Sequence, residues 1–291
     1  MDKGRRLRDR LAAPGMLVVP GAYDALGARL IEQAGFDAVY MTGAGASAAR
    51  GYPDFGLLTM SEMLDNAATM ARSVHTPLIA DADTGYGNEL NVTVTVREYE
   101  ARGIAALHLE DQVSPKRCGH LDGKEVVERA EYLSKIRAAV QARRTSDFFI
   151  IARTDARAVL GLDEAVWRAR AALDEGADMA FVEATQSIEE AAAVPTLVKG
   201  PCLLNMVPGG RTPVSNLRHA EEMGYKLALL PGLLLLATID ACDVALAEVA
   251  RGGVPTPKTG VADAFRRVGS AEWDELRARF NAAGRSAPEA K

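Results

Sequence analysis

Short apolar segments alternate with longer amphipathic segments along most of the chain, from Met16 to Arg251. The apolar segments have the length of buried strands, and the amphipathic segments repeat apolar residues at the three-to-four spacing of helices. This alternation is typical of strand–helix units around a parallel sheet. Eight segments predict strands, at Leu17–Pro20, Ala38–Thr42, Leu78–Asp83, Ala106–Glu110, Phe148–Arg153, Met179–Glu183, Cys202–Met206 and Lys226–Leu230. Because eight parallel strands close a barrel, the predicted fold class is α/β, a (β/α)8 TIM barrel.

The helical segments follow these strands. The clearest are Ala25–Ala34, Ser61–Ser73, Val92–Arg102, Val126–Ala142, Leu162–Glu175 and Leu234–Arg251. Gly35, Gly103 and Gly176 end three of them, as glycine commonly does after a helix C-terminus. An open doubly wound sheet would show the same alternation, but no G-x-G-x-x-G motif opens the first helix. We therefore favour the barrel over a dinucleotide-binding fold.

The pattern changes after Arg251. Pro255 and Pro257 interrupt a glycine-containing stretch, a further helical pattern covers Ala271–Asn281, and the tail is polar. We expect residues 1–251 to form the barrel catalytic domain. Residues 252–291 are expected to form a linker, a C-terminal helix and a polar tail.

Composition narrows the class of partner. Of the 291 residues, 48% are hydrophobic and 25% charged, as in an ordinary globular protein, and the formal net charge is -5. Since no basic block stands out, we expect no nucleic-acid and no membrane binding, which leaves a small-molecule substrate. The basic N-terminus lacks the apolar run of a secretory signal, and no stretch approaches the roughly 20 apolar residues of a membrane helix. We expect a cytoplasmic protein.

The three cysteines, Cys118, Cys202 and Cys242, are too widely spaced for a disulfide framework or a zinc pattern. Cys202 and Cys242 lie in apolar segments and are expected in the core. His75 and His219 are expected at the surface or in packing, and His108, inside a predicted strand, is expected to be a core histidine with satisfied hydrogen bonds.

The segment Leu109–Lys124 concentrates reactive side chains. It holds Glu110, Asp111, Lys116, Arg117, Cys118 and His120. Neighbouring cations favour the thiolate, so Cys118 can serve as a nucleophile or as a proton donor near neutral pH. Gly119 and Gly123 supply the backbone freedom that a loop closing over a ligand requires. The alternative is a solvated, charged loop.

Carboxylates stand at the ends of the third and fourth predicted strands. Asp81 and Asp83 are two residues apart, which on a strand places both side chains on one face, and Glu110 ends the next strand. Such oxygen ligands suit Mg²⁺ with several retained waters. The alternative is that these acids cap the helices that follow.

Polar residues also end the later strands. Arg153 fits a bidentate clamp on a substrate carboxylate and fits equally an ion pair with Glu183, and the sequence does not separate the two. Asn205 offers a further polar contact. The small residues of Tyr40–Gly45 can bring backbone N–H groups close to an anion.

Three motifs together, KRCGH at 116–120, DADTGYGN at 81–88 and IARTDA at 151–156, resemble the isocitrate lyase and phosphoenolpyruvate mutase superfamily. The similarity runs from about Val18 to Ala250. It implies a barrel whose last helix is exchanged with a neighbouring subunit in a homotetramer, a dimer of dimers. It also implies Mg²⁺, with Mn²⁺ as a substitute, near the third and fourth strand ends, and a mobile loop carrying the K-R-C-G-H signature.

The resemblance also implies residue roles. It assigns Lys116, Cys118, Gly119 and His120 to the gating loop and Asp81, Asp83 and Glu110 to the metal shell. It assigns Tyr40, Thr42, Gly43, Ala44, Arg153, Glu183 and Asn205 to the substrate pocket, with Asp54 near the site. The candidate catalytic residues are Cys118, Lys116, His120, Arg153 and Glu183.

Within the superfamily, Cys118 favours the carbon–carbon lyases, because the phosphoenolpyruvate mutases and phosphonopyruvate hydrolases generally lack this cysteine. The chain length is similar to that of the short lyases of the 2-methylisocitrate and 2,3-dimethylmalate type. Carboxyphosphonoenolpyruvate mutase resembles the chain through HLEDQVSPKRCGHLDGK. Oxaloacetate acetylhydrolase resembles it through KRCGH but has serine at the position of Asp122. Thr42-Gly43-Ala44 stands where 2-methylisocitrate lyase has S-G-G.

We therefore expect a Mg²⁺-dependent lyase that splits a 2-hydroxy di- or tricarboxylate into a 2-oxo acid and a carboxylate. Cys118 is the candidate acid that protonates the departing carbanion, and the base is left open. The alternatives are a phosphonomutase, an oxaloacetate hydrolase or decarboxylase, and a non-catalytic ligand-binding barrel. We expect the loop Lys116–Lys124 to be poorly ordered without ligand, because few apolar side chains anchor it.

Overall fold

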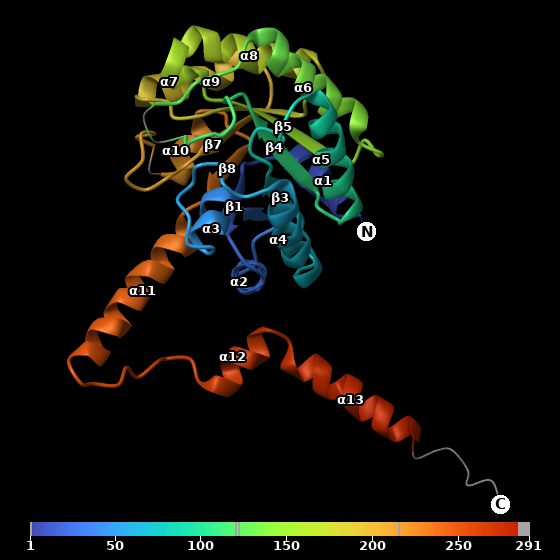
Figure 1. The fold of residues 1–291 in the computed structure, drawn as a ribbon, viewed down its shortest axis with the longest axis vertical. Helices are drawn as coiled ribbons and strands as arrows, with labels where there is room; N and C mark the ends of the chain where they lie inside the picture. The colour runs from blue at the N-terminus through green and yellow to red at the C-terminus, as the bar shows by residue number, and fades with distance from the viewer. Residues whose placement is uncertain (1, 120, 122, 215, 285–291) are drawn as a thin grey trace, which may run out of the picture. The chain divides into compact units, whose positions relative to one another are not determined.

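The computed structural model describes residues 2–119, 121, 123–214 and 216–284 (Figure 1). The chain forms two compact units, Met1–Thr238 and Ile239–Lys291. The first unit contains every strand. The expected division into a barrel domain and a C-terminal segment at residue 251 stays a prediction.

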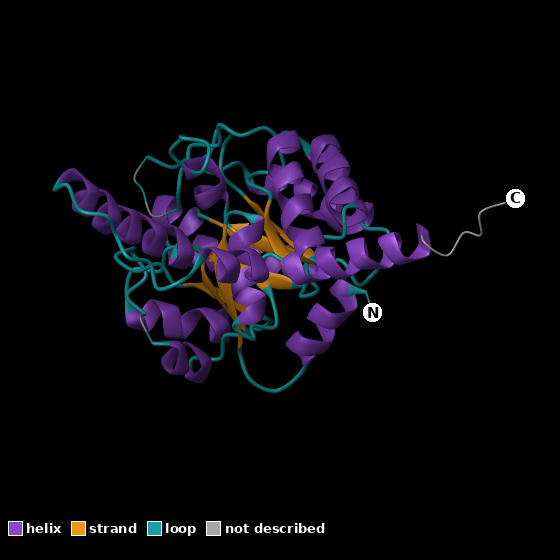
Figure 2. Cartoon of the chain, turned by 90° about the horizontal axis from the view of Figure 1, so that it is seen from below, coloured by secondary structure: helices purple, strands orange, loops and turns teal. Residues whose placement is uncertain are grey.

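Eight parallel strands form a closed barrel in the first unit. They are β1 (Leu17–Ala22), β2 (Val39–Met41), β3 (Leu78–Asp81), β4 (Ala106–Glu110), β5 (Phe149–Thr154), β6 (Met179–Val182), β7 (Cys202–Asn205) and β8 (Leu227–Leu230). Each strand pairs with the next in chain order, and β8 pairs with β1, with Leu17 opposite Leu227. Figure 2 shows the strands inside a surround of helices. The predicted (β/α)8 barrel is confirmed.

The predicted helices all form, with ends within three residues of those expected. They are α2 (Ala25–Gln33), α4 (Met60–Ser73), α5 (Glu89–Ala101), α6 (Arg129–Ala142), α8 (Leu162–Asp174), α11 (Leu233–Ala250) and α13 (Ser270–Gly284). The sequence did not delimit α1 (Lys3–Ala12), α3 (Gly43–Ala48), α7 (Ala156–Leu160), α9 (Ile188–Val198), α10 (Leu217–Glu222) and α12 (Val261–Arg267). Helix α6 begins later than expected because Val126 pairs with Gln112 in an antiparallel bridge.

Helix α1 packs against the N-terminal end of the barrel. Its Leu7 is 1% exposed and belongs to one apolar cluster with Leu17, Ala106 and Phe149, each at or next to the start of its strand. Burial of this cluster stabilises the barrel interior. With α1 packed there, the opposite end, where the strands finish, is left for a ligand.

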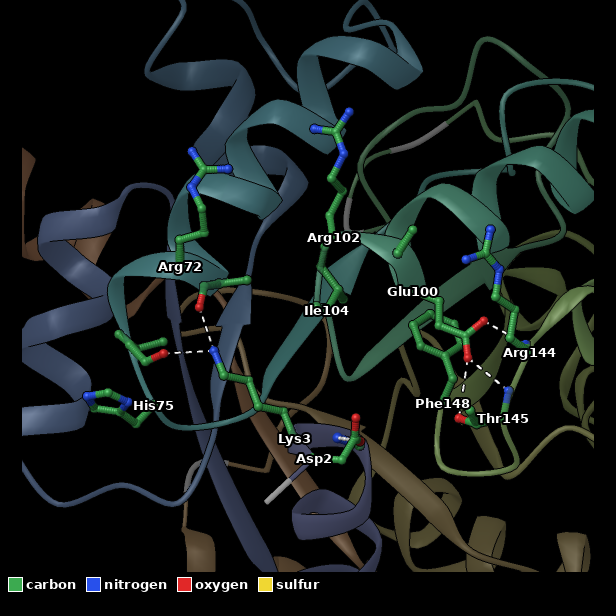
Figure 3. Close-up of a pocket in the computed structure, with 15 residues that line it drawn as sticks. Asp2, Lys3, Arg72, His75, Glu100, Arg102, Ile104, Arg144, Thr145 and Phe148 are labelled. Carbon is green, nitrogen blue, oxygen red and sulfur yellow. Dashed lines mark hydrogen bonds between the residues drawn. The ribbon is translucent and has the colours of Figure 1, made fainter.

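A hollow of about 670 Å³ also lies at the N-terminal end (Figure 3). Its charged groups serve the fold. The Lys3 ammonium donates to the carbonyls of Ala71 and Val74 at the end of α4, and Glu100 accepts from the backbone N–H groups of Arg144 and Thr145. Such contacts cap helix ends and turns, so the charged groups of this hollow have a structural role.

Cys202 and Cys242 were both expected to be buried in the core. Cys202 is buried, as predicted, but Cys242 on α11 is exposed, so that prediction was wrong. Val244 and Leu246 on the same helix are also 73% and 66% exposed.

His75 and His219 lie at the surface, as expected. Of the helices in the described part of the chain, none has the length and apolar character needed to span a membrane. The cytoplasmic location stays a prediction.

Candidate active site

A cavity of about 190 Å³ lies at the C-terminal end of the barrel. Its lining residues are Tyr40, Thr42, Ala44, Asp54, Asp81, Cys118, Gly119, Arg153, Glu183, Asn205, Val207, Pro231, Gly232, Leu235 and Leu236. The first ten are candidates named from the sequence. Gly43, Asp83, Glu110 and Lys116 contact lining residues or one another behind this wall. His120 and Asp122 lie outside the described residues.

A left-handed turn directs the two aspartates of the DADTGYGN motif. Strand β3 ends at Asp81, and Asp83 lies in the following turn with φ 46°. The expectation that both residues occupy one strand face was therefore wrong. The Asp83 N–H donates to Asp81 Oδ1 at 3.0 Å, a local turn that aspartate favours. Backbone held in this region is strained and is found preferentially at functional sites.

Gly43 binds Asp81 directly. Its N–H donates to Asp81 Oδ2 at 3.1 Å, and a Cβ at position 43 would lie 2.5 Å from the same oxygen. We expected this segment to offer N–H groups to an anion. In the structure the N–H of Gly43 instead holds the carboxylate of Asp81 in place.

Lys116 joins three parts of the site. Its ammonium hydrogen-bonds Asp54 and lies 3.0 Å from Asp83 Oδ1. The side chain is 4% exposed. Burial alone would lower the pKa of Lys116, but the surrounding carboxylates, Asp83 and Asp54 foremost, raise it well above its usual value. The ammonium is therefore charged at neutral pH.

Arg153 lies among three carboxylates. Its Nε is 2.9 Å from Asp155 Oδ2 and 3.1 Å from Glu110 Oε2, and its Nη2 is 3.5 Å from Glu183 Oε2. Asn205 Nδ2 donates to the same Glu183 oxygen at 3.0 Å. The expected ion pair with Glu183 is present, and the clamp on a substrate carboxylate stays a proposal.

The carboxylates fit a divalent cation. Burial is the main reason that the pKa of Asp83 rises to about 6 and that of Glu110 rises well above its usual value, and neighbouring carboxylates add to both shifts. Asp83 Oδ1 and Glu110 Oε2 are buried and make ion pairs but no hydrogen bond, so lone pairs remain for a ligand.

No three His, Cys, Asp or Glu side chains of the described residues lie close enough to hold a metal by themselves. Mg²⁺ does not require such a cage, because it keeps several waters and commonly binds one or two carboxylates together with the substrate. The residues present therefore fit Mg²⁺ in that mode.

The cysteine loop is held by polar contacts at both ends. Across the base of the loop, the backbone N–H groups of Val113 and Val127 donate to the carbonyls of Glu125 and Asp111. The Gln112 side chain binds both Glu110 and the backbone of Arg117. The N–H of Cys118 donates to the Asp54 carbonyl at 3.0 Å. These contacts bring the half-buried thiol to the cavity wall.

His108 is fully buried inside the barrel. Its Nε2 lies 2.8 Å from the Tyr40 hydroxyl and 3.6 Å from Asp81 Oδ1, while Nδ1 has no hydrogen-bond partner in the structure. Burial lowers the pKa of His108 to about 4, so the ring is neutral at neutral pH. The expectation of a satisfied core histidine holds for one ring nitrogen only.

One wall of the cavity is apolar and was not anticipated. Val207, Pro231, Leu235 and Leu236 come from the segments after β7 and β8. In the sequence these residues look like core or helix, and only their position directly after predicted strands could have indicated a pocket.

The fold and the site define the class of the protein: a (β/α)8-barrel enzyme, with a carboxylate cluster at its strand ends and a thiol on a loop beside them. Residues 7–250 match the family described as phosphoenolpyruvate phosphomutase. The chain therefore belongs to the phosphoenolpyruvate mutase family, as its motifs predicted.

Curated relatives narrow the class further. The chain is 48% identical to 2,3-dimethylmalate lyase from Eubacterium barkeri, over 79% of this chain and 80% of that protein. It is 40% identical to 2-methylisocitrate lyase from Bacillus subtilis, over 82% and 78% of the two chains. These relatives support the predicted class, a carbon–carbon lyase.

Two solved structures are also similar. Oxaloacetate acetylhydrolase in complex with 3,3-difluorooxalacetate superposes with a TM-score of 0.92 and 41% identity, covering 97% of each chain. Phosphonopyruvate hydrolase in complex with oxalate and Mg²⁺ superposes with a TM-score of 0.87 and 32% identity, covering 96% of this chain and 99% of that one.

Proposed function

We propose that the protein is a Mg²⁺-dependent lyase that cleaves the carbon–carbon bond of a 2-hydroxy di- or tricarboxylate of the 2,3-dimethylmalate or 2-methylisocitrate type. The products are a 2-oxo acid and a second carboxylate. The observation that carries the proposal is that Cys118, Arg153 and Asp81 line one cavity at the strand ends. A proton donor, a carboxylate-binding cation and a metal-competent carboxylate are the groups this cleavage needs.

The metal would be held by Asp81, Asp83 and Glu110, directly or through water. When bound, Mg²⁺ supplies positive charge beside the 2-oxygen and the adjacent carboxylate of the substrate. The Mg²⁺ in the similar phosphonopyruvate hydrolase complex supports this choice of ion. Mn²⁺ has similar ligand preferences and is the expected substitute.

The reaction divides between two sides of the substrate. Loss of the hydroxyl proton turns the C2–O bond into a carbonyl as the C2–C3 bond breaks, and the electron pair remains on C3. The Cys118 thiol then gives its proton to C3, which completes the carboxylate product. Arg153 binds and orients a substrate carboxylate, and Lys116 keeps Asp54 and Asp83 in place.

The apolar wall favours a substrate with alkyl substituents at the carbon that departs. Val207, Pro231 and Leu235 offer no hydrogen-bonding side chain, so a methyl group is accommodated there and a charged group is not. This supports 2,3-dimethylmalate, whose departing carbon carries a methyl group, over oxaloacetate.

The test is a substrate panel with the purified protein and Mg²⁺. It contains 2,3-dimethylmalate, 2-methylisocitrate, oxaloacetate, phosphonopyruvate and carboxyphosphonoenolpyruvate, with release of 2-oxo acid, acetate and phosphate measured separately. We expect 2-oxo acid release from a methyl-substituted substrate. Turnover of oxaloacetate to oxalate and acetate alone, or of a phosphonate alone, would replace the proposal.

We also propose that α11 packs against a second copy of the chain in a homotetramer. The helix is 18 residues long and none of its residues is buried in the single chain. Exposed apolar side chains such as Ile239, Val244, Leu246 and Val249 mark an interaction surface. Light scattering should give the mass of four subunits, and Leu246→Glu should lower it; a monomeric wild type would disprove the proposal.

A further inference from the structure

Lys124 has an unusual environment for a lysine. Its side chain is 2% exposed, and its ammonium donates to two groups, the carbonyl of Gly119 and Asp155 Oδ1 at 2.8 Å. Lysines are almost never buried this fully unless they are paired, and breaking such a pair leaves a buried charge. The position therefore has a demanding structural requirement, although Lys124 is not one of the described residues that line the cavity.

The first contact of Lys124 is with the residue that follows the cysteine. Gly119 directly follows Cys118. The Lys124 ammonium donates to the Gly119 carbonyl and holds it in place. Gly119 in turn lies against the pocket, because a Cβ there would be 2.5 Å from Arg153 Nη2 and 2.6 Å from Glu183 Cγ.

The second contact of Lys124 reaches the cation of the pocket. Asp155 is fully buried and accepts from Arg153 through both oxygens, from Nε at 2.9 Å and from Nη2 at 3.3 Å. Burial would raise the pKa of Asp155, but Arg153 and Lys124 together lower it below its usual value. The carboxylate is therefore charged and binds both cations at once.

We propose that Lys124 is a positioning residue that couples the Cys118 thiol to the Arg153 guanidinium. The Lys124 ammonium holds two groups: the Gly119 carbonyl, next to Cys118, and the Asp155 carboxylate, which orients Arg153. Since protonation of C3 requires both groups at fixed positions on one substrate, loss of Lys124 misplaces them relative to each other. This inference rests on the proposed function where it is tested by turnover. Where it is tested by the reactivity of the Cys118 thiol, it rests on the geometry alone.

A purely structural role predicts something different. A lysine that only stabilised the fold would lower the midpoint of thermal unfolding without changing the folded enzyme's kinetics. A coupling role predicts a folded enzyme with a misplaced thiol. The matched control is Lys135→Met on α6, which removes another buried lysine, one whose ion pair is with Glu131 of its own helix.

The kinetic test compares Lys124→Met with the wild type and with the control. We expect kcat/KM to fall by about 10²-fold in Lys124→Met, the usual consequence of a displacement near 1 Å, and to stay within about threefold in Lys135→Met. Lys124→Ala should show the same loss and recover about tenfold on addition of propylammonium, which replaces the missing cation. Full activity in Lys124→Met, or loss without recovery in folded Lys124→Ala, would overturn the proposal.

The chemical test needs no turnover. In a Cys242→Ser background, the rate of Cys118 alkylation by iodoacetamide is followed by mass spectrometry of the modified peptide. We expect the rate to rise about tenfold in Lys124→Met, because the backbone beside the thiol is released. An unchanged rate refutes the coupling even if the substrate panel finds no activity. Lys124→Leu, which also removes the donor for the Gly119 carbonyl, replaces Lys124→Met if that variant does not fold; the same rise is required.

Discussion

Replacing Gly119 with alanine is the sharpest perturbation that the site offers. The added methyl group would lie 2.5 Å from Arg153 Nη2 and 2.6 Å from Glu183 Cγ. Ordinary contacts between such atoms are about 3.5 Å or more, so the loop or the guanidinium must move by about 1 Å. Gly119 has no left-handed backbone angle, so the effect comes from the contact and not from strain.

A displacement of that size costs about 10²-fold in rate when it separates groups that act on one substrate. We expect Gly119→Ala to lose about that factor in kcat/KM, with the thermal unfolding midpoint almost unchanged because the core clusters are untouched. The control is Gly260→Ala, whose new methyl would lie 3.7 Å from Asp263 Oδ2, an ordinary contact distance. If Gly119→Ala turns over substrate at the wild-type rate, Gly119 does not contact Arg153 during catalysis, and the proposed effect of this contact on the rate is refuted.

Three further predictions follow from the same structure. Excess EDTA should abolish turnover and Mg²⁺ should restore it; activity that survives the chelator excludes a metal at Asp83. Cys118→Ser should lower kcat by roughly 10²–10⁴ with KM nearly unchanged, and a covalent adduct trapped on the wild-type sulfur would show a nucleophile instead of an acid. Hydrogen bonds from Arg129 lower the pKa of Glu164 to about 2, so its stabilisation is complete above its unfolded pKa of about 4.3 and is lost as the pH falls toward 2. The difference in the free energy of unfolding between Glu164→Gln and the wild type should therefore shrink over that range in urea titrations, and a constant difference would contradict the assignment.

The barrel could be predicted because each strand is short, apolar and followed by a helix, and because the count reaches eight. Local pattern does not reveal where a strand gives way to a turn. Asp83 shows this, since its left-handed φ of 46° depends on hydrogen bonding to Asp81 and not on any strand periodicity. Cys242 shows a second reason for failure. An apolar segment indicates that its surface is covered, but the segment does not indicate whether the same chain covers it, and Cys242 is exposed in this chain.

The polar part of the site was within reach of the sequence because charged residues at the ends of buried strands are conspicuous. The apolar wall was not, since Pro231 and Leu235 have side chains that fit a core equally well. The role of Lys124 was also out of reach. Its partner Asp155 is 31 residues away, and only the folded loop brings the two together.

Closure of the sheet has a consequence for synthesis of the chain. Strand β1 has two neighbouring strands, and one of them is β8, where Leu227 lies opposite Leu17 near the end of the first compact unit. At about 5–20 residues per second, a ribosome needs roughly 10–40 s to make the chain between them. Throughout that interval β1 keeps an unpaired edge, the kind of surface that invites aggregation. We therefore expect the nascent protein to be most prone to aggregation before its last strand emerges.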